Sequence, residues 1–397
     1  MKKIAIVSCY FQHNYGSMLQ AYATQMVLDK LGYDNETIDI SGFNQEIKKA
    51  KIKYFIKASL TSSILASKMG MVKNILLKRV LKNEYSSLSD VRSRKFETFK
   101  NKYFRLSKKY HSKNQLSKEC ELRYSAVVVG SDQLWLPGNI AADYYTLNFV
   151  PKSVNTVAYA TSFGQSSLPR DSAKKAATFL RRIRHIGIRE ESGQKLIKQL
   201  TNRNVPVVCD PTMLFTGEDW MSIQQETPII EEPYIFCYFL GNNPPHREFA
   251  KRLKKETGYK IVALTHLDEY VKCDEDYADE KPYNVDPADF LNLIHNASYI
   301  CTDSFHCTVF SILYRRDFFT FHRYAGNTKQ STNSRIDSLF HMLEIGERIM
   351  QGEEDVRDSL KTHLDFDCIL NKLAHVREES YRYLVMALND DEGTDLS

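Results

Sequence analysis

Short apolar stretches alternate with amphipathic segments along most of this chain, and that alternation limits the folds available to it. Residues 3–8 form the first apolar stretch, and residues 17–31 then place Leu19 and Ala23 at helical spacing. Similar apolar stretches recur at residues 36–40, 126–129, 156–160, 186–188, 206–209, 234–240, 261–264, 299–302 and 318–321. Strands that are apolar throughout and separated by helices are typical of parallel sheets covered on both faces. We therefore predict an α/β protein.

The chain is too long for one typical hydrophobic core, because it has 397 residues. A polar, acidic stretch at residues 216–232 separates two sets of alternating segments and is the expected linker. We predict an N-terminal α/β domain over residues 1–225 and a smaller C-terminal α/β domain over residues 226–350. C-terminal helices and an acidic tail are expected over residues 351–397. Further helices are predicted at residues 171–182, 190–200, 246–257, 287–295, 305–314 and 354–387.

One segment departs from the alternation and carries most of the basic charge. Residues 48–113 hold 19 Lys or Arg and 3 Asp or Glu, and basic and apolar residues are interleaved in them. We predict a basic helical insertion over residues 45–115. It is either a solvated helical hairpin or a surface for anionic lipid or a lipid-linked anionic substrate. Nucleic acid is not expected as a partner, because no helix-turn-helix, RNA-binding or zinc-finger signature accompanies the charge.

The first residues are not expected to form a secretion signal, because Ser8 and Gln12 interrupt the apolar stretch after a few positions. No stretch approaches the roughly 18–20 apolar residues that span a bilayer. We expect a soluble, cytoplasmic protein, peripheral at the inner face of the cell membrane if residues 48–113 bind lipid. The eight cysteines include no C-x-x-C pair and are expected to be free, buried thiols. No metal site is expected, because Cys301, His306 and Cys307 lack a second cluster that would complete a zinc site.

Polar residues follow the predicted strands at the positions where ligands bind in open parallel sheets. Helices that begin after such loops attract anions through their free N–H groups. These loop residues are 13–17, 130–132, 161–164, Arg189, 210–212 and 303–306.

Each of these residues also has a purely structural interpretation. Gly16 and Gly130 could only form tight turns, Asp132 and Asp303 could only cap helices, and His306 could be a structural histidine. The chain contains no G-x-G-x-x-G, P-loop, H-E-x-x-H or G-x-S-x-G motif. That absence disfavours dinucleotide oxidoreductases, nucleotide triphosphatases, zinc proteases and α/β-hydrolases.

Several of these segments, taken in order, resemble the polysaccharide pyruvyltransferase family. The resemblance rests on residues 14–23, 128–135, 188–192, 210–212, 302–311 and 333–336, and it spans roughly residues 1–345 outside the basic insertion. It implies two Rossmann-like parallel-sheet domains that face a cleft, as in GT-B glycosyltransferases, with the active site in that cleft.

The resemblance also implies a reaction. Family members move a pyruvyl group from phosphoenolpyruvate onto two hydroxyls of a sugar in a cell-surface glycan, which gives a ketal and phosphate. Phosphoenolpyruvate is then the donor substrate, no cofactor or metal is needed, and the acceptor is a glycan, lipid-linked or nascent.

Individual roles follow from the matching positions. His306 matches the family histidine and is the expected general acid and base, a task suited to imidazole. Asp303 and Asp132 are expected to hold sugar hydroxyls or orient a partner. The remaining motif residues are expected to bind substrate, with Arg189 as first choice for the donor anion and Arg335 as second: Arg189, Arg335, Asn14, Tyr15, Gly16, Ser131 and Ser304.

One position departs from the family pattern. Ser304 stands two residues before His306, where better-characterised members carry a donor-binding arginine. Arg323, His322 or Arg335 could supply the missing cation, or the donor could differ. The alternative is a GT-B glycosyltransferase that uses a nucleotide sugar. A third interpretation is a non-catalytic scaffold that the basic insertion recruits to the membrane.

Overall fold

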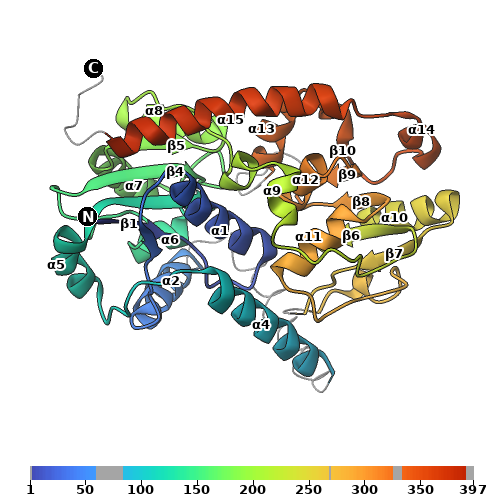
Figure 1. Ribbon diagram of the computed structural model, residues 1–397, viewed down its shortest axis with the longest axis horizontal. Coiled ribbons are helices and arrows are strands. Elements are labelled where there is room, and N and C mark those ends of the chain that lie inside the picture. Colours follow the sequence, from blue (N-terminus) through green and yellow to red (C-terminus); the bar gives the residue numbers. More distant parts are fainter. Residues whose placement is uncertain (1, 60–83, 268–269, 325–332, 390–397) are drawn as a thin grey trace.

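The computed structural model describes residues 2–59, 84–267, 270–324 and 333–389, and it contains two separate parallel sheets (Figure 1). The first has the strand order β2-β1-β3-β4-β5 and the second the order β10-β9-β8-β6-β7. The strands of the first sheet are β1 (Lys3–Val7), β2 (Asn35–Thr37), β3 (Tyr124–Asp132), β4 (Asn155–Thr161) and β5 (His185–Ile188). Those of the second are β6 (Tyr234–Tyr238), β7 (Lys260–Ala263), β8 (Tyr299–Thr302), β9 (Asp317–Phe321) and β10 (Ile349–Met350).

The central strands are buried on both faces, which explains their continuous apolar sequences. All seven residues of β4 are buried, and β1 pairs in parallel with β3 through Ile4 opposite Ala126. Parallel strands of this kind need helices over both faces of the sheet. The predicted class, two Rossmann-like parallel-sheet α/β units, is therefore confirmed.

One predicted strand is absent from the structure, and one observed strand was not predicted. Residues 206–209 do not form a strand and make only an isolated parallel bridge between Ile188 and Val207. Pro206, which starts this stretch, has no N–H to offer to a ladder. The short strand β10 had no apolar signal in the sequence.

Helices connect the strands, and all except those at residues 137–142 and 334–343, which were not predicted, lie close to the predicted positions. Asp286 caps one of them with a reciprocal capping box, and Pro287 occupies its first turn, as the Asp-Pro pair predicts. These connecting helices are α1 (Tyr15–Lys30), α6 (Pro137–Ala142), α7 (Arg170–Arg182), α8 (Glu191–Thr201), α10 (Pro244–Thr257), α11 (Pro287–His295), α12 (Phe305–Leu313) and α13 (Ser334–Leu343).

The described part of the basic segment is helical. Helix α2 (Asn44–Ser59) packs against α6 of the first unit, and α4 (Glu84–Tyr103) reaches across to α11 of the second (Figure 1). On α4, Arg92 donates hydrogen bonds to the backbone oxygens of Thr265, Pro282 and Tyr283. Helix α5 (Lys113–Arg123) leads into β3. The central part of the predicted insertion, residues 60–83, lies outside the described residues.

The C-terminal segment joins the two units. The predicted helical stretch is two helices, α14 (Val356–Lys361) and the long α15 (Phe366–Asn389). Helix α15 runs along both units and contacts β4 as well as α12 and α13 (Figure 1). The acidic tail, residues 390–397, lies outside the described residues. Among the residues that the structure describes, no helix is long and apolar enough to cross a membrane.

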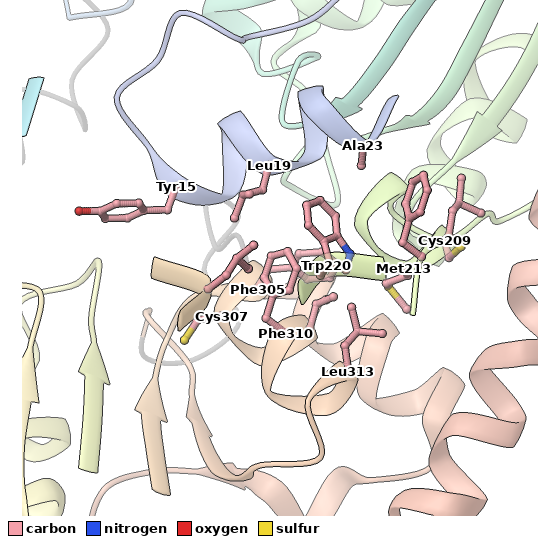
Figure 2. Close-up of a cluster of buried hydrophobic side chains, with 14 of the residues drawn as sticks. Tyr15, Leu19, Ala23, Cys209, Met213, Trp220, Phe305, Cys307, Phe310 and Leu313 are labelled. Atoms are coloured by element: carbon pink, nitrogen blue, oxygen red, sulfur yellow. The ribbon is translucent and has the colours of Figure 1, made fainter. Parts of the chain in front are cut away.

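A continuous apolar core also links the two sheets. Figure 2 shows side chains of α1, of the short helix at Pro211–Leu214 and of α12 meeting in one cluster. Trp220, from helix α9 (Gly217–Met221), packs edge-on against Phe310 with ring centroids 5.1 Å apart. Because the cluster is shared, the loops at the carboxyl ends of both sheets are held at fixed positions relative to each other.

Candidate active site

A cavity of about 330 Å³ lies where the carboxyl ends of the two sheets face each other. The first unit contributes the loops after β1 and β3 together with helix α2, and the second contributes the loop after β6 and the starts of α12 and α13. The lining residues are Cys9, Gln12, Asn14, Ser17, Lys51, Phe55, Asp132, Gln133, Leu134, Leu136, Gly138, Asn139, Leu240, Ser304, Phe305, His306, Arg323 and Arg335. The cavity thus lies at the carboxyl ends of the strands, where ligands are expected to bind in open parallel sheets.

The start of α1 forms one wall of this cavity. The Oδ1 atom of Asn14 accepts a hydrogen bond from the Ser17 backbone N–H at 3.0 Å, which caps the helix. Gly16, in the first turn, lies directly against the imidazole of His306. Tyr15 points elsewhere: its ring stacks on Phe290 at 4.7 Å and it does not line the cavity.

Asp132 ends β3 with a φ of 70° and presents its carboxylate to the cavity. Its Oδ2 atom accepts a hydrogen bond from the Ser17 hydroxyl at 2.5 Å, and its Oδ1 atom lies 3.8 Å from Nη2 of Arg189. Burial alone would raise the pKa of this carboxyl. The charges of Arg189, His306 and Arg335 outweigh burial and hold the pKa of Asp132 below its ordinary value.

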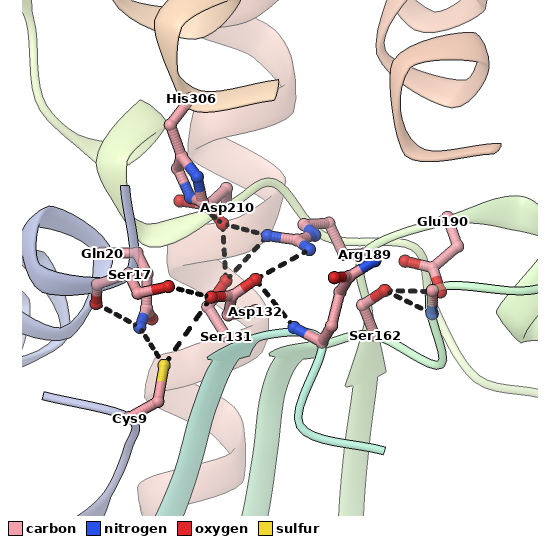
Figure 3. A network of polar contacts seen from close by, with 12 residues as sticks. Cys9, Ser17, Gln20, Ser131, Asp132, Ser162, Arg189, Glu190, Asp210 and His306 are labelled. Carbon is pink, nitrogen blue, oxygen red and sulfur yellow. Dashed lines mark hydrogen bonds and ion pairs between the residues drawn. The ribbon is translucent and has the colours of Figure 1, made fainter. Parts of the chain in front are cut away.

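Behind the cavity wall, Asp210 joins three groups into one polar network (Figure 3). Its Oδ2 atom accepts hydrogen bonds from the Ser131 hydroxyl at 2.5 Å and from Nη1 of Arg189 at 2.7 Å. The same oxygen lies 3.5 Å from Nε2 of His306. Although burial opposes it, the charges of His306 and Arg189 with these hydrogen bonds keep the pKa of Asp210 well below its ordinary value. Asp210 is therefore an ionised partner for the imidazole.

His306 stands in the first turn of α12 with its side chain 7% exposed. Its Nε2 atom donates to no hydrogen-bond acceptor among the described residues, although the Asp210 carboxylate is near. An imidazole that lines a cavity and has an ionised carboxylate beside it can hold a proton and release it to a ligand. This placement suits the acid–base role predicted for His306.

Arg335 lies in the first turn of α13 and lines the cavity. It makes no hydrogen bond to any residue that the structure describes, and its Nε atom is buried. Phe305 lies beside both arginines, with its ring centroid 4.7 Å from Cζ of Arg189 and 5.9 Å from Cζ of Arg335. Burial, followed by repulsion from Arg189, lowers the pKa of Arg335 to about 9. A bound anion would offset the free-energy cost of burying the charged Arg335 guanidinium beside Arg189.

Around Ser304, the structure arranges several of the predicted residues. Ser304 caps α12 and lines the cavity. The buried Asp303 faces the other way and accepts hydrogen bonds from the backbone N–H groups of Leu240 and Gly241 at 2.6 and 2.9 Å. Arg323 lies 3.8 Å from Oδ1 of Asp303 and lines the cavity.

The structure thus brings most predicted site residues together but gives them different positions. Asn14, Asp132, Ser304, His306 and Arg335 line the cavity, and Gly16 touches the His306 ring. Ser131, Arg189 and Asp303 are buried behind its wall, where they position neighbours. Of the possible substitutes for the missing arginine, His322 is paired with Asp337 at 2.7 Å, whereas Arg323 and Arg335 reach the cavity.

Three contributors were not predicted. Asp210 was seen in a family motif but given no role, because only its contact with Arg189 reveals one. Lys51 and Phe55 belong to the basic segment, and no sequence signal places them in the cavity. All eight cysteines are unpaired, and Cys9, Cys209 and Cys301 are buried, as their apolar surroundings predict. The expectation of burial is wrong for Cys273, which is partly exposed, and for Cys368, which is exposed on α15.

Comparison with solved structures shows the fold. A UDP-N-acetylglucosamine 2-epimerase from Rickettsia bellii superimposes with a TM-score of 0.51 at 12% identity, covering 98% of this chain and 97% of the other. A Listeria monocytogenes protein, described as a candidate UDP-N-acetylglucosamine 2-epimerase, gives a TM-score of 0.52 at 8% identity, covering 100% and 99%. The arrangement is therefore GT-B-like. No curated protein matches the sequence.

A family model decides the relationship. The model of polysaccharide pyruvyl transferases matches residues 14–321, which include the α1 loop, Asp132, Arg189, Asp210 and His306. This range covers more than half of the chain and includes strands β2 to β9. The protein belongs to the polysaccharide pyruvyl transferase family.

Proposed function

We propose that this protein transfers a pyruvyl group from phosphoenolpyruvate onto two hydroxyls of a glycan, forming a cyclic ketal and releasing phosphate. The observation that carries the proposal is the cavity in which the His306 imidazole, the Arg335 guanidinium and the Asp132 carboxylate meet. These groups match the demands of a small dianionic enol ester and a neutral polyol.

Anion binding falls mainly to the second unit. Arg335 lines the cavity and donates to no residue that the structure describes, and a planar guanidinium suits bidentate contact with a carboxylate. Arg323 adds a second cation on the same wall. Arg189, the first choice from the sequence, is already bound to Asp210 at 2.7 Å. Its proposed role is to position Asp210 and add positive potential.

Proton transfer falls to His306. In the proposed reaction, protonated His306 gives its proton to C3 of the enol, and positive charge develops at C2. A sugar hydroxyl oxygen bonds to C2 and loses its proton to the now neutral imidazole. The C2–O bond to phosphate then breaks with its electron pair, and the leaving phosphate takes the proton from His306. The second hydroxyl oxygen bonds to C2 and gives its proton to the neutral imidazole, which restores protonated His306. Asp210 stabilises the imidazolium form throughout.

The acceptor is proposed to lie on the Asp132 side. A carboxylate whose pKa is held low is a poor base at neutral pH but a good acceptor of hydrogen bonds from sugar hydroxyls. The Asn14 side chain lines the same wall. A lipid-linked or nascent glycan at the inner membrane face fits the basic segment next to the cavity.

The test is phosphate release from phosphoenolpyruvate, followed by phosphorus NMR with a panel of glycans and lipid-linked glycans. We expect acceptor-dependent phosphate and a ketal product. His306→Gln should reduce the rate at least about 100-fold, as expected for loss of a general acid. The matched control is His375→Gln, an exposed histidine on α15, which should keep the wild-type rate. Absence of donor consumption with every acceptor would contradict the proposal.

A second candidate is a glycosyltransferase that uses a nucleotide sugar. Ser304 in place of the expected arginine and the likeness to sugar-nucleotide epimerases favour it. A thermal-shift panel separates the two, since a ligand that binds the folded state raises the melting temperature. Stabilisation by UDP, GDP or CMP without stabilisation by phosphoenolpyruvate would favour the glycosyltransferase.

A further inference from the structure

Lys51 is a cation of the basic segment that faces the candidate active site. Helix α2 packs against α6, and this contact places Lys51 and Phe55, one turn apart, in the cavity lining. The Phe55 ring lies beside Gly138 at the start of α6, where an added Cβ would be 3.2 Å from Cζ of the ring. The Lys51 ammonium lies 6.0 Å from the centroid of the buried Tyr145 ring.

The environment of Lys51 differs from that of an ordinary surface lysine. Its side chain is half-buried, and burial lowers the pKa of its ammonium group. It forms no ion pair with any acidic residue that the structure describes, whereas Lys57 on the same helix pairs with Asp171. A partly desolvated ammonium without a counterion is unfavourable in the free protein, and a bound anion would offset that cost.

The cations of the cavity belong to different walls. Arg323 and Arg335 come from the second unit, and Lys51 comes from the first. A ligand with a single anionic group would need only one of these walls. A ligand with two anionic groups can engage both, and phosphoenolpyruvate carries a carboxylate and a phosphate.

We propose that Lys51 forms a second anion subsite in this cavity and binds the phosphate of the donor while Arg335 binds its carboxylate. The inference rests on the proposed function. Lysine binds phosphate as a point charge, and the planar guanidinium of arginine matches a carboxylate. The basic insertion then supplies the cation that Ser304 does not.

The experiment is calorimetric titration of the full-length protein with phosphoenolpyruvate, inorganic phosphate and pyruvate. Pyruvate carries the carboxylate without the phosphate, and inorganic phosphate lacks the carboxylate. Pyruvate therefore probes the Arg335 subsite, and phosphate probes the Lys51 subsite. Lys51→Met keeps the length of the side chain without its charge, and Lys51→Arg keeps the charge. Lys53→Met is the matched control, because Lys53 is an exposed lysine on α2 that does not line the cavity.

We expect Lys51→Met to weaken phosphoenolpyruvate and phosphate by about 10–100-fold, the range for a lost charge-assisted hydrogen bond, and pyruvate by less than about threefold. Lys51→Arg should restore most of the affinity, and Lys53→Met should match the wild type. Wild-type affinity of Lys51→Met for phosphate would overturn the proposal, as would an equal loss for pyruvate and phosphate. If the wild type binds phosphate through Lys51 but never consumes phosphoenolpyruvate, the donor assignment fails and the Lys51 subsite stands.

Discussion

Gly16 and His306 come from different units of the fold, yet a Cβ atom on Gly16 would lie 2.2 Å from Nδ1 of the His306 imidazole. Real Cβ contacts are not that short, so any larger residue must displace the ring. The glycine is therefore needed for close approach and not for a left-handed backbone, because it lies within the regular helix α1. This contact sets where the imidazole stands in the cavity.

We predict that Gly16→Ala reduces the rate of phosphate release at least about 100-fold. A methyl group there shifts His306 away from Asp210 and from the donor, and displacements of about 1 Å cost rates of this order. Steady-state kinetics on the folded variant, checked by circular dichroism, measures the effect. The control is Gly346→Ala, where an added Cβ has no neighbour within 4 Å. A wild-type rate for folded Gly16→Ala would show that ring position is not critical.

The second prediction is that the Arg335 charge lowers the stability of the free protein but is needed to bind phosphoenolpyruvate. Its pKa in the folded protein, about 9, lies below that of an unfolded arginine, so at neutral pH the charged form is penalised by folding. Arg335→Met should therefore raise the melting temperature of the free protein by roughly 2 °C. It should also abolish the further stabilisation that phosphoenolpyruvate gives.

Thermal unfolding measured without phosphoenolpyruvate and with phosphoenolpyruvate at about 5–10 mM gives both melting temperatures. Arg382→Met, at an exposed arginine paired with Glu378 on α15, should change neither quantity appreciably. A lower melting temperature together with an intact response to phosphoenolpyruvate would mean that Arg335 is a structural residue.

The third prediction is a pH dependence of stability that arises from Asp132. Its pKa is lower in the folded protein than in the unfolded chain, so the carboxylate stabilises the fold above the unfolded value near 3.9. That contribution is lost as pH falls through the lower, folded value. Asparagine tolerates the positive φ of this position, so Asp132→Asn removes the charge without straining the backbone.

Urea unfolding at pH 7, 5, 4 and 3, spaced around the roughly 3.9 reference value, tests this sign. Asp132→Asn should be less stable than the wild type by about 1–3 kcal/mol at pH 7, and the difference should shrink below pH 4. Asp276→Asn, at an exposed aspartate, should stay within about 0.5 kcal/mol of the wild type at pH 7. A difference that is constant with pH would rule out the electrostatic explanation.

Much of the fold was accessible from the sequence because its parallel strands are buried on both faces. Such strands are continuous apolar stretches, and β3 and β8 show the pattern clearly. Asp132 and His306 were both predicted to follow the carboxyl end of a strand, where ligands bind in open parallel sheets. The stretch after Pro206 misled the prediction, since apolar residues alone do not provide ladder hydrogen bonds.

The parts of the site that escaped prediction depend on tertiary contacts. Lys51 enters the cavity because α2 packs on α6, and neither helix carries a mark of that contact in its sequence. Asp210 acquires its role only beside Arg189 and His306. A family motif also does not tell which way a side chain points. Tyr15 belongs to such a motif, yet it does not line the cavity.

The last prediction uses Tyr15 to separate packing from substrate binding. Its ring is 3% exposed, lies parallel to Phe290 at 4.7 Å and meets Tyr238 edge-on at 5.7 Å, so it joins α1 to the second unit. Its hydroxyl donates a hydrogen bond to the Val285 backbone oxygen at 3.2 Å.

Tyr15→Phe should cost about 1 kcal/mol of stability and leave phosphoenolpyruvate affinity unchanged. Tyr15→Leu should destabilise more strongly, because the aromatic contacts between the units are lost. Urea unfolding and calorimetric titration measure the two quantities side by side. If Tyr15→Phe lost affinity for phosphoenolpyruvate while keeping wild-type stability, the Tyr15 hydroxyl would belong to the substrate site.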